Sequence, residues 1–495
     1  MEEAILELSK RTSDLGTEEN NVYTLKKGQL IELFIADMAY GGKGIAKIET
    51  EKGIYIIFVP NAIPGQKVQC RVTKRNRKYA EARLIRVLQP SSLEIEIPFQ
   101  AASGAPYASL DLATQHFYKK RNTLEQFKRI ALVSNIEDYL DEFVASPVLW
   151  HYRNKMEFNF SGIVWNIGDE KSHNGFGFGF KKRACWWASE NLEKSSGLFD
   201  EQFENAMSRI RKYLEETGLP AYHHIRNEGF YRILQVKKSY FEDKLLMNLN
   251  TTSEGLDQFS LPAFYDFIND LFPNRVKGLI HSINDEVSDR FNGPEGQKSI
   301  LGDPFIVEKI NGLEFQINSY SFFQTNPKSA EVLYNKVIDY VFEEEVKGQV
   351  LDLFCGTGTI AQLIAKREQN QLVTGVELVP EAVEDAKINA QKNELKNVKF
   401  IAADVGQFLK DHPEYQNQID VLVLDPPRGG ISKKALRAAM RLNARKVVYV
   451  SCNPSTQARD ANWMNDFDYQ LKKLSIVDQF PHTSHIETIA VFEKN

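Results

Sequence analysis

The chain has 495 residues, of which 42% are hydrophobic and 26% are charged, and its formal net charge is −5. The composition is ordinary for a soluble protein, and the length predicts roughly two to four domains. Because the overall charge is negative, any contact with nucleic acid must come from local basic patches. The first residues are polar and acidic, so a signal peptide is not expected, and no run of about 18 apolar residues predicts a membrane-spanning helix.

The four cysteines lie far apart, at positions 70, 185, 355 and 452, and none belongs to a CxxC pair. This spacing argues against a disulfide framework and against a zinc finger. We therefore expect a cytoplasmic protein without a metal site.

Residues 1–22 are predicted to be a flexible tail, and residues 23–90 a small β-barrel. Five short β-like runs begin at Tyr23, and turn signals such as Pro64-Gly65 separate them. Five short strands of this length are typical of an OB-type barrel. The end of this region is basic. Its basic face either binds a phosphate backbone or is only solvated, and the sequence favours neither alternative. The basic residues are Arg71, Lys74, Arg75, Arg77, Lys78, Arg83 and Arg86.

Residues 91–320 are predicted to be a mixed α+β central domain. A helix is expected within 107–135, packed on the following domain, with Lys119, Lys120 and Arg121 facing solvent. Alternating runs between Trp150 and Tyr320 indicate antiparallel strands. The segment 174–187, NGFGFGFKKRACWW, favours a twisted hairpin with a core tryptophan over an exposed aromatic that stacks on a base.

Residues 321–495 are predicted to be an α/β domain with a Rossmann-like, doubly wound sheet. Strand, loop and helix alternate through GQVLDLFCGTGTIAQLIAK, LVTGVEL, KFIAADV, DVLVLDPP and KVVYVSC. This rhythm is typical of parallel strands with helices on both faces. In such sheets ligands bind outside the carboxyl ends of the strands, so the residues there are the candidates for chemistry.

Three consecutive strand ends carry groups that suit a nucleoside ligand. Gly356 and Gly358, in DLFCGTGT, allow a ligand to approach the backbone just before a helix begins. The loop is neither the dinucleotide fingerprint, since the third glycine is missing, nor a phosphate loop, since no GK[ST] follows. Glu377 can accept from ribose hydroxyls and Asp404 from an adenine amino group. Each carboxylate alone is most often a helix cap or a loop residue, but the ordered set favours a ligand.

The fourth and fifth strand ends add Asp425 and Cys452. Asp425 begins DPPR, and either this motif lies near the reacting groups or its prolines simply stop the strand. Read together, the strand ends resemble those of the S-adenosylmethionine-dependent methyltransferases. Cys452, in VVYVSCNP, ends a buried strand; because a lone cysteine is usually a small buried hydrophobe, its importance depends on the other motifs.

The motifs DPPRGG, SCNP, FPHTSHIETI and SFFQTN together resemble the RNA 5-methyluridine (uracil-C5) methyltransferases, of the type that has an N-terminal TRAM domain and modifies 23S ribosomal RNA. The likeness covers nearly the whole chain. It implies that residues 23–90 are an RNA-binding TRAM barrel, that the central domain binds RNA, and that S-adenosylmethionine is the methyl donor. It also implies that Cys452 is the nucleophile and Glu487 the general base. The residues implied to contact the cofactor or line the site are Gln324, Phe354, Glu377, Asp425 and, less constantly, Asp404.

One departure from this family concerns iron. Many bacterial members carry a CxxxxxCGGC motif and a fourth cysteine for a [4Fe–4S] cluster, whereas this chain has PFQAASGAPY there and no cysteine between positions 71 and 184. We therefore predict that it binds no iron–sulfur cluster.

The implied reaction accounts for these residue types. Uracil C5 is a poor nucleophile until a thiolate adds to C6 and produces an enolate, and a base must later remove the C5 proton. A free thiol is mostly protonated near neutral pH, and Arg428 is a candidate for lowering the pKa of Cys452. Asp425 could contact the uracil edge or the cofactor, and Phe323 or Phe354 could stack on the extruded base or on adenine.

Several other functions have signatures that can be compared with this sequence. An adenine-N6 methyltransferase would use an NPPY-type loop and no thiol, and a cytosine-C5 enzyme would place a cysteine after a proline in the fourth motif, whereas DPPR is followed here by Gly429. The basic barrel argues against a small-molecule methyltransferase, and intact Cys452, Glu487 and Glu377 argue against a non-catalytic RNA-binding protein. We expect a monomer that acts on RNA, with 23S ribosomal RNA favoured over transfer RNA, and no membrane partner.

Overall fold

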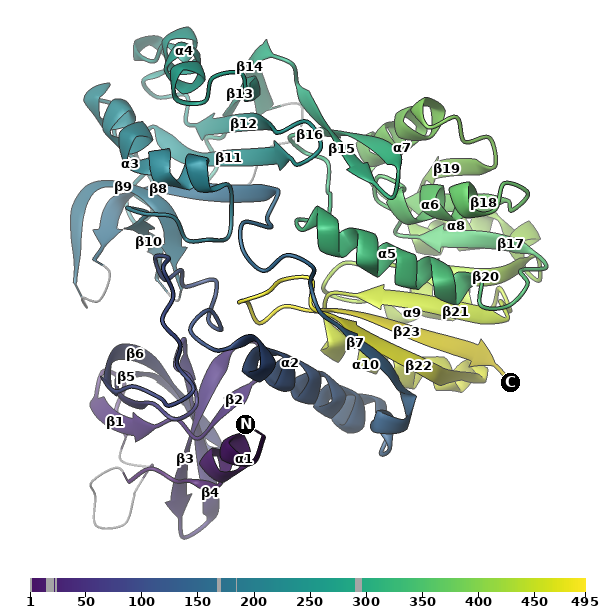
Figure 1. The fold of residues 1–495 in the computed structure, drawn as a ribbon, viewed down its shortest axis with the longest axis horizontal. Helices are drawn as coiled ribbons and strands as arrows, with labels where there is room; N and C mark the ends of the chain where they lie inside the picture. The colour runs from purple at the N-terminus through teal and green to yellow at the C-terminus, as the bar shows by residue number, and fades with distance from the viewer. Residues whose placement is uncertain (1, 15–21, 23–24, 167–170, 184, 290–295) are drawn as a thin grey trace.

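The structure, a computed structural model, describes residues 2–14, 22, 25–166, 171–183, 185–289 and 296–495. Three large sheets follow one another along the chain, and helix α2 (Leu112–Gln126) lies between the first sheet and the third (Figure 1). None of the described helices is long and apolar enough to cross a membrane.

The chain begins with a helix where the sequence predicted a flexible tail. Helix α1 (Glu2–Lys10) is amphipathic, and its Ile5 is completely buried. Ile5 packs in a cluster with Met38, Ile63 and Tyr107, so the apolar partners that hold the helix come from later in the chain. A prediction from the local sequence could not include those partners. The remaining residues of the expected tail, 1 and 15–21, lie outside the described residues.

The N-terminal sheet has six strands in the order β1-β5-β6-β4-β3-β2. It has one strand more than the expected five, because the first β-like run divides at Ile35 and Ala36 into β1 and β2. Buried and accessible residues alternate along β3 and β5, so one face of the sheet holds the core. The strands are β1 (Leu30–Phe34), β2 (Asp37–Ala39), β3 (Lys43–Thr50), β4 (Gly53–Pro60), β5 (Lys67–Arg75) and β6 (Tyr79–Gln89).

The central sheet has seven strands in the order β10-β9-β8-β11-β12-β13-β14. Its core is built on aromatic rings around Phe158, whose centroid lies 5.5 Å from that of Phe203 and 5.7 Å from that of Phe180. In the segment 174–187, Trp187 packs against a small buried cluster, whereas Trp186 is 60% exposed. The elements are β8 (Lys155–Trp165), β9 (Ser172–Lys182), β10 (Cys185–Asn191), α3 (Glu201–Glu216), β11 (Tyr231–Ser239), β12 (Lys244–Thr251), η4 (Leu256–Gln258), α4 (Leu261–Leu271), β13 (Val276–Ile283) and β14 (Gln297–Gly302).

The C-terminal sheet has eight strands in the order β19-β18-β17-β20-β21-β23-β22-β7. Strands β19 to β21 of this order are parallel, as expected, but β23 runs antiparallel between β21 and β22, so the sheet is mixed rather than purely parallel. The strands are β17 (Gln349–Leu353), β18 (Val373–Glu377), β19 (Val398–Ala402), β20 (Ile419–Leu424), β21 (Lys446–Ser451), β22 (Tyr469–Val477) and β23 (Glu487–Lys494).

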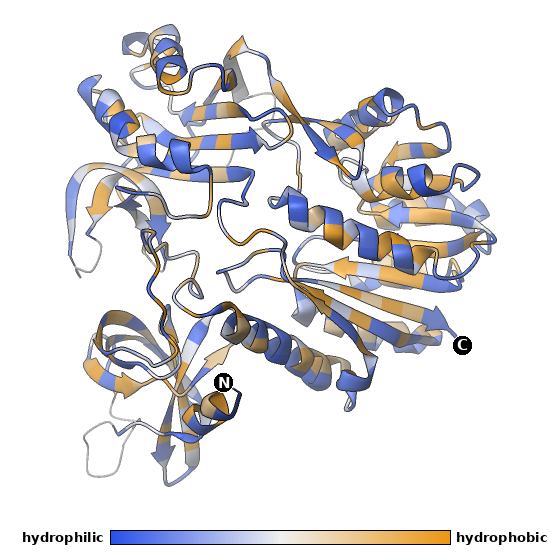
Figure 2. Cartoon of the chain, viewed as in Figure 1, coloured by the Kyte–Doolittle hydropathy of each residue, from blue (hydrophilic) through white to orange (hydrophobic). Residues whose placement is uncertain are grey.

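Helices cover both faces of this sheet, which makes it doubly wound and Rossmann-like as predicted. Hydrophobic residues line the strands in Figure 2, and two separate apolar clusters form, one on each face. Helices α5, α6 and α7 pack in one cluster, and α8, α9 and α10 in the other. Their bounds are α5 (Pro327–Val341), α6 (Thr359–Arg367), α7 (Pro380–Lys392), α8 (Val405–Asp411), η6 (Pro413–Tyr415), α9 (Lys433–Met440), α10 (Pro454–Met464) and η7 (Asn465–Phe467).

Three segments before residue 321 also belong to the core of this sheet. Strand β7 (Leu140–Val144), which follows η3 (Ile136–Tyr139), pairs in parallel with β22. Helix α2 and the π-helical turn η2 (Phe127–Ala131) contribute Leu124 and Phe127 to one apolar cluster. The hairpin of β15 (Phe305–Ile310) and β16 (Leu313–Asn318) packs in the other cluster. The chain therefore passes through the C-terminal core before it forms that domain's own strands.

Candidate active site

A cavity of about 1150 Å³ opens at the carboxyl ends of the parallel strands. Parallel register brings these ends to one edge: Leu353 of β17 pairs with Val376 of β18 and with Leu424 of β20. All seven candidate residues line this one cavity: Gln324, Phe354, Glu377, Asp404, Asp425, Cys452 and Glu487. The structure therefore brings together side chains that are up to 163 residues apart, Gln324 and Glu487, in sequence.

The loop after β17 has a backbone that few residues tolerate. Phe354 has a φ of +67°, which is uncommon for a bulky side chain, and Gly356 and Gly358 have φ of +54° and +73°. A Cβ at Gly358 would lie 2.4 Å from Cε1 of Phe400, whereas a Cβ at Gly356 would meet no atom within 4 Å. Gly358 is thus required by packing at the start of α6, and Gly356 leaves the backbone open on the cavity side.

Glu377 is fixed at the end of β18 by this loop. One carboxylate oxygen accepts from the backbone N–H of Gly356 at 3.1 Å, and the other accepts from that of Val379 at 3.0 Å. Each oxygen keeps lone-pair capacity for a further donor, such as a ribose hydroxyl. The geometry therefore presents an oriented acceptor next to an accessible backbone.

Asp404 both caps a helix and lines the cavity, so the helix-cap and ligand-binding interpretations of this residue are compatible. Its side chain caps helix α8 by accepting from the backbone N–H of Gln407 at 2.9 Å, and the residue also lines the cavity. A capping role uses one carboxylate oxygen, so the second is left for a ligand.

Three carboxyl groups lie close together in the floor of the cavity. Burial raises the pKa of Asp425 to about 7, and burial and the charge of Asp425 raise the pKa values of Asp352 and Glu487 well above their usual range. Asp425 is partly accessible through the cavity but surrounded by protein, and Asp352 is completely buried. Burial therefore favours the neutral form of Asp352 and Glu487, and Asp425, whose pKa is about 7, is poised between its two forms near neutral pH.

Cys452 and Glu487 face each other across two adjacent strands. Ser451 and Thr488 are the last paired residues of β21 and β23, and the Thr488 hydroxyl donates to the Ser451 carbonyl at 3.0 Å. Cys452 and Glu487 are the next position in this antiparallel register, at which opposite Cα atoms lie about 4.5–5.5 Å apart. Both side chains line the cavity.

The pKa of Cys452 is raised, whereas the sequence suggested that Arg428 would lower it. Burial raises the pKa of this thiol to about 11, the charge of Glu487 adds to the rise, and Arg428 lowers it through its charge and a hydrogen bond. Arg428 thus acts in the expected direction, but burial outweighs it. The thiol of the free protein is therefore protonated at neutral pH.

Both phenylalanines of the segment SFFQTN line the cavity, but they differ in exposure. Phe323 is only 8% exposed and packs against Phe315, with ring centroids 5.9 Å apart. Phe322 is 67% exposed and lines the cavity, so it is the ring with a free face. The sequence pattern does not reveal which of two adjacent phenylalanines is the more buried. Gln324, one residue further on, is 6% exposed.

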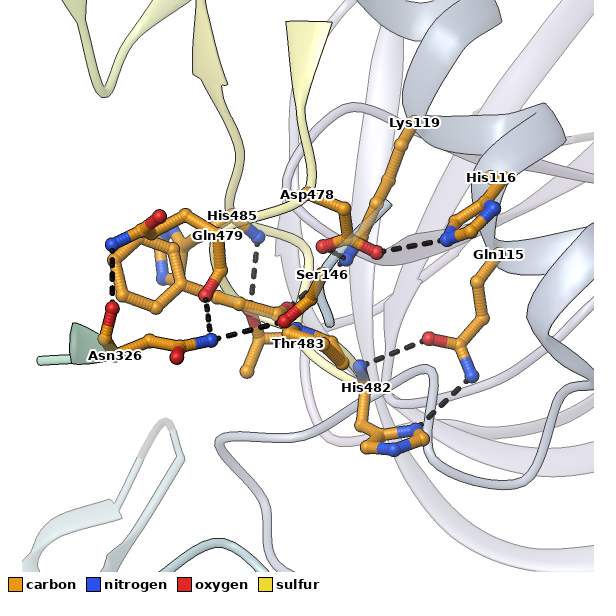
Figure 3. A network of polar contacts seen from close by, with 12 residues as sticks. Gln115, His116, Lys119, Ser146, Asn326, Asp478, Gln479, His482, Thr483 and His485 are labelled. Carbon is orange, nitrogen blue, oxygen red and sulfur yellow. Dashed lines mark hydrogen bonds and ion pairs between the residues drawn. The ribbon is translucent and has the colours of Figure 1, made fainter. Parts of the chain in front are cut away.

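A buried polar network holds the segment that leads into Glu487 (Figure 3). Asp478 accepts from Lys119 at 2.6 Å and contacts His116 at 3.1 Å, and Lys119 also donates to the carbonyl of Phe480 at 3.0 Å. Lys119 is 3% exposed, so the prediction that it faces solvent is wrong. Its charge is balanced by an aspartate 359 residues away, which helical periodicity cannot reveal.

Known proteins match most of the chain. A methyltransferase-domain family model matches residues 344–488, and a TRAM-domain model matches residues 25–85. A relative from Clostridium tetani named as an RNA methyltransferase is 35% identical over 94% of this chain and 98% of its own, and one from Clostridium acetobutylicum is 34% identical over 95% and 99%. The chain belongs to the RNA methyltransferases.

The fold of this RNA methyltransferase is also found among solved structures. The tRNA (uracil-54, C5)-methyltransferase of Pyrococcus abyssi, in complex with S-adenosyl-L-homocysteine, superimposes with a TM-score of 0.67 at 24% identity, over 92% of this chain and 98% of that one. The enzyme therefore combines a TRAM domain with a methyltransferase domain, and its fold is that of an S-adenosylmethionine-dependent methyltransferase. The accessible backbone at Gly356 and the oriented carboxylate of Glu377 provide partners suited to an adenosyl group.

The four cysteines of the RNA methyltransferase are distributed over the three parts of the chain. Cys70 is buried in the TRAM sheet and Cys185 in the central sheet, while Cys355 and Cys452 line the cavity. Among the described residues, no group of three or more His, Cys, Asp and Glu side chains has the arrangement of a metal site.

Proposed function

We propose that this enzyme methylates C5 of a specific uridine in RNA through a covalent bond between Cys452 and C6 of the base. The observation that carries the proposal is the facing position of Cys452 and Glu487 within the cavity built by the ends of the parallel strands. A thiol and a carboxyl group on adjacent strands can act on neighbouring atoms of one pyrimidine ring.

Each group has one chemical task. Cys452 first loses its thiol proton to water in the cavity. The thiolate adds to C6, the electron pair of the C5–C6 double bond moves toward the O4 carbonyl, and C5 becomes nucleophilic. C5 would then take the methyl group of bound S-adenosylmethionine, with the S–CH3 bond broken and S-adenosylhomocysteine as the leaving group. Glu487 then removes the C5 proton, the double bond re-forms, and the thiolate leaves C6. Burial raises the pKa of Glu487, which makes its ionised form a stronger base than an exposed carboxylate.

The other cavity residues are proposed to bind and orient the cofactor and the base. Glu377 would accept from the ribose hydroxyls and Asp404 from the adenine amino group. Gln324, Phe354 and Asp425 would line the space between the cofactor and the uracil. Asp425 has a pKa of about 7, so its carboxyl group can donate or accept a hydrogen bond near neutral pH.

The RNA strand is proposed to run from the cavity onto the TRAM domain. Lys74, Arg75, Arg77, Lys78 and Arg86 are exposed on strands β5 and β6 and the turn that joins them, which favours a phosphate backbone as their ligand. A base must leave its stack to enter the cavity, and that costs least in a single-stranded loop. We favour 23S ribosomal RNA as the substrate, with transfer RNA as the alternative.

The test combines a cellular and a chemical measurement. Mapping 5-methyluridine in ribosomal and transfer RNA from cells without the gene should reveal one missing site, and the RNA that contains it identifies the substrate. Purified enzyme should release tritium from RNA labelled at uridine C5, and Cys452→Ala should abolish release while S-adenosylmethionine still binds. Methylation of adenine N6 or cytosine C5, or full turnover by Cys452→Ala, would refute the proposal.

A further inference from the structure

A tyrosine side chain of the TRAM domain reaches the catalytic turn. The Tyr40 hydroxyl, in the connection between β2 and β3, donates to the Asn453 side-chain oxygen at 3.5 Å, across 413 residues of sequence. Asn453 follows Cys452 directly. Burial raises the pKa of Tyr40 to about 12, and the charges of Cys452 and Glu487 add to this rise while that of Arg428 opposes it. The phenol therefore faces the same groups as the proposed nucleophile.

The Tyr40 connection also touches the segment that carries Glu487. Gly42 has a φ of +71°, and a Cβ there would lie 2.7 Å from Cγ of Pro106 and 3.2 Å from Cβ of Ser484. Ser484 lies three residues before Glu487 in the chain. The connection therefore contacts both the turn that follows Cys452, through Tyr40, and the segment that precedes Glu487, through Gly42. Gly42 has no room for a larger side chain.

Two arginines from other parts of the chain hold the connection in place. Arg183, between β9 and β10, donates to the Gly41 carbonyl at 3.0 Å and to Asn61 at 3.1 Å. Arg121, in α2, donates to Asp37 at 2.6 Å and to the Met38 carbonyl at 3.2 Å. The position of Tyr40 is therefore set jointly by the TRAM, central and catalytic parts of the enzyme.

We propose that Tyr40 is a positioning residue for methyl transfer, so that the TRAM domain is a structural part of the active centre as well as an RNA-binding module. The inference rests on the proposed role of Cys452. The Asn453 side chain also donates to the Arg428 carbonyl at 3.0 Å and accepts from the Ser455 N–H at 3.1 Å. Tyr40 thus acts on the side chain that joins the cysteine turn to Arg428, and the rate of thiol addition depends on that orientation.

The test removes the hydroxyl and measures the chemical step separately from binding. Tyr40→Phe should lower the single-turnover rate at saturating RNA about fivefold, the loss expected for one hydrogen bond, with unchanged RNA and S-adenosylmethionine affinities. RNA that contains 5-fluorouridine traps the Cys452 adduct, because fluorine cannot leave C5 as a cation, and trapping should slow by the same factor. Tyr55→Phe is the matched control, since it removes a hydroxyl that donates to the Asn76 carbonyl at 2.8 Å inside the same domain.

A second variant moves Tyr40 without changing it. Gly42→Ala should displace the connection and slow trapping at least as much as Tyr40→Phe does. Wild-type rates in both variants, or a loss of RNA affinity alone, would overturn the inference while leaving the proposed function intact. Absence of any adduct with the wild-type enzyme would overturn both.

Discussion

Lys119 of α2 and Asp478, which follows β22, form an ion pair of 2.6 Å with side chains that are 1% and 0% exposed. The pKa of Asp478 is lowered although burial raises it, because Lys119 and His116 favour the charged form. The pair joins the helix between the TRAM and catalytic sheets to the segment that ends at Glu487 (Figure 3). A buried pair of this kind adds little net stability, but removal of one partner leaves an uncompensated charge.

We predict that Lys119→Met lowers the free energy of unfolding by about 3–5 kcal/mol in urea denaturation near neutral pH. Without the lysine, burial raises the pKa of Asp478 in the folded state, so the loss is complete above that raised pKa and shrinks as acid protonates the carboxylate. Lys119→Met combined with Asp478→Asn should recover part of the loss. Lys120→Met, a change at the adjacent exposed lysine, should stay within about 0.5 kcal/mol of the wild type. Equal losses at Lys119 and Lys120 would contradict this account.

Sequence reasoning located the strand-end residues because their signals are local. Gly356, Glu377, Asp404, Asp425 and Cys452 each stand at or just after a short apolar run that a turn terminates, and parallel strands bring such positions to one edge. The cavity that they line is the direct consequence of that topology.

The features that sequence reasoning missed depend on partners far away in the chain. Lys119 is buried because of Asp478, helix α1 is held by residues of later segments, and strand β7 joins a sheet whose other strands begin more than 200 residues later. Periodicity reveals which face of an element is apolar, but it does not reveal which element covers it.

Gly358 and Gly356 allow backbone strain and crowding to be separated by experiment. Gly358→Ala adds a Cβ 2.4 Å from Phe400 at a φ of +73°, and we predict a loss of about 1–3 kcal/mol in the free energy of unfolding. Gly356→Ala has positive φ but open space, so it should cost less stability and instead weaken S-adenosylmethionine binding. Urea denaturation and calorimetry measure the two effects.

Gly175→Ala is the control for these glycine variants, because its Cβ would make only ordinary contacts at 3.4 Å or more. Pairing Gly358→Ala with Phe400→Leu should relieve the crowding but not the strain. If Gly358→Ala is as stable as the wild type, the close approach to Phe400 is not a constraint on this loop.

Arg428 should set the pH at which Cys452 becomes reactive. The pKa of this thiol is about 11 with Arg428 in place, and loss of the guanidinium should raise it further. We predict that alkylation of Cys452 by iodoacetamide in the free enzyme accelerates as pH rises, and that Arg428→Met shifts this rise to higher pH. Peptide mass spectrometry assigns the modified cysteine. Arg437→Met, at an exposed position on α9, should leave the profile unchanged, and coincident profiles for Arg428→Met and wild type would exclude a role for Arg428 in ionisation.

Glu487→Gln tests the proton-removal step separately from thiol addition. Glutamine has nearly the same shape and cannot accept the C5 proton, so the methylated base should stay bonded to Cys452. We predict that the variant accumulates a covalent complex with unmodified RNA, seen as a denaturing-gel shift whose mass includes the added methyl group. The wild type should show no such complex. Glu493→Gln, on the same strand β23, should behave as wild type, and Cys452→Ala with Glu487→Gln should form no complex. A variant that loses activity without any complex would show that Glu487 acts before or during thiol addition, and the base would have to be sought elsewhere in the cavity.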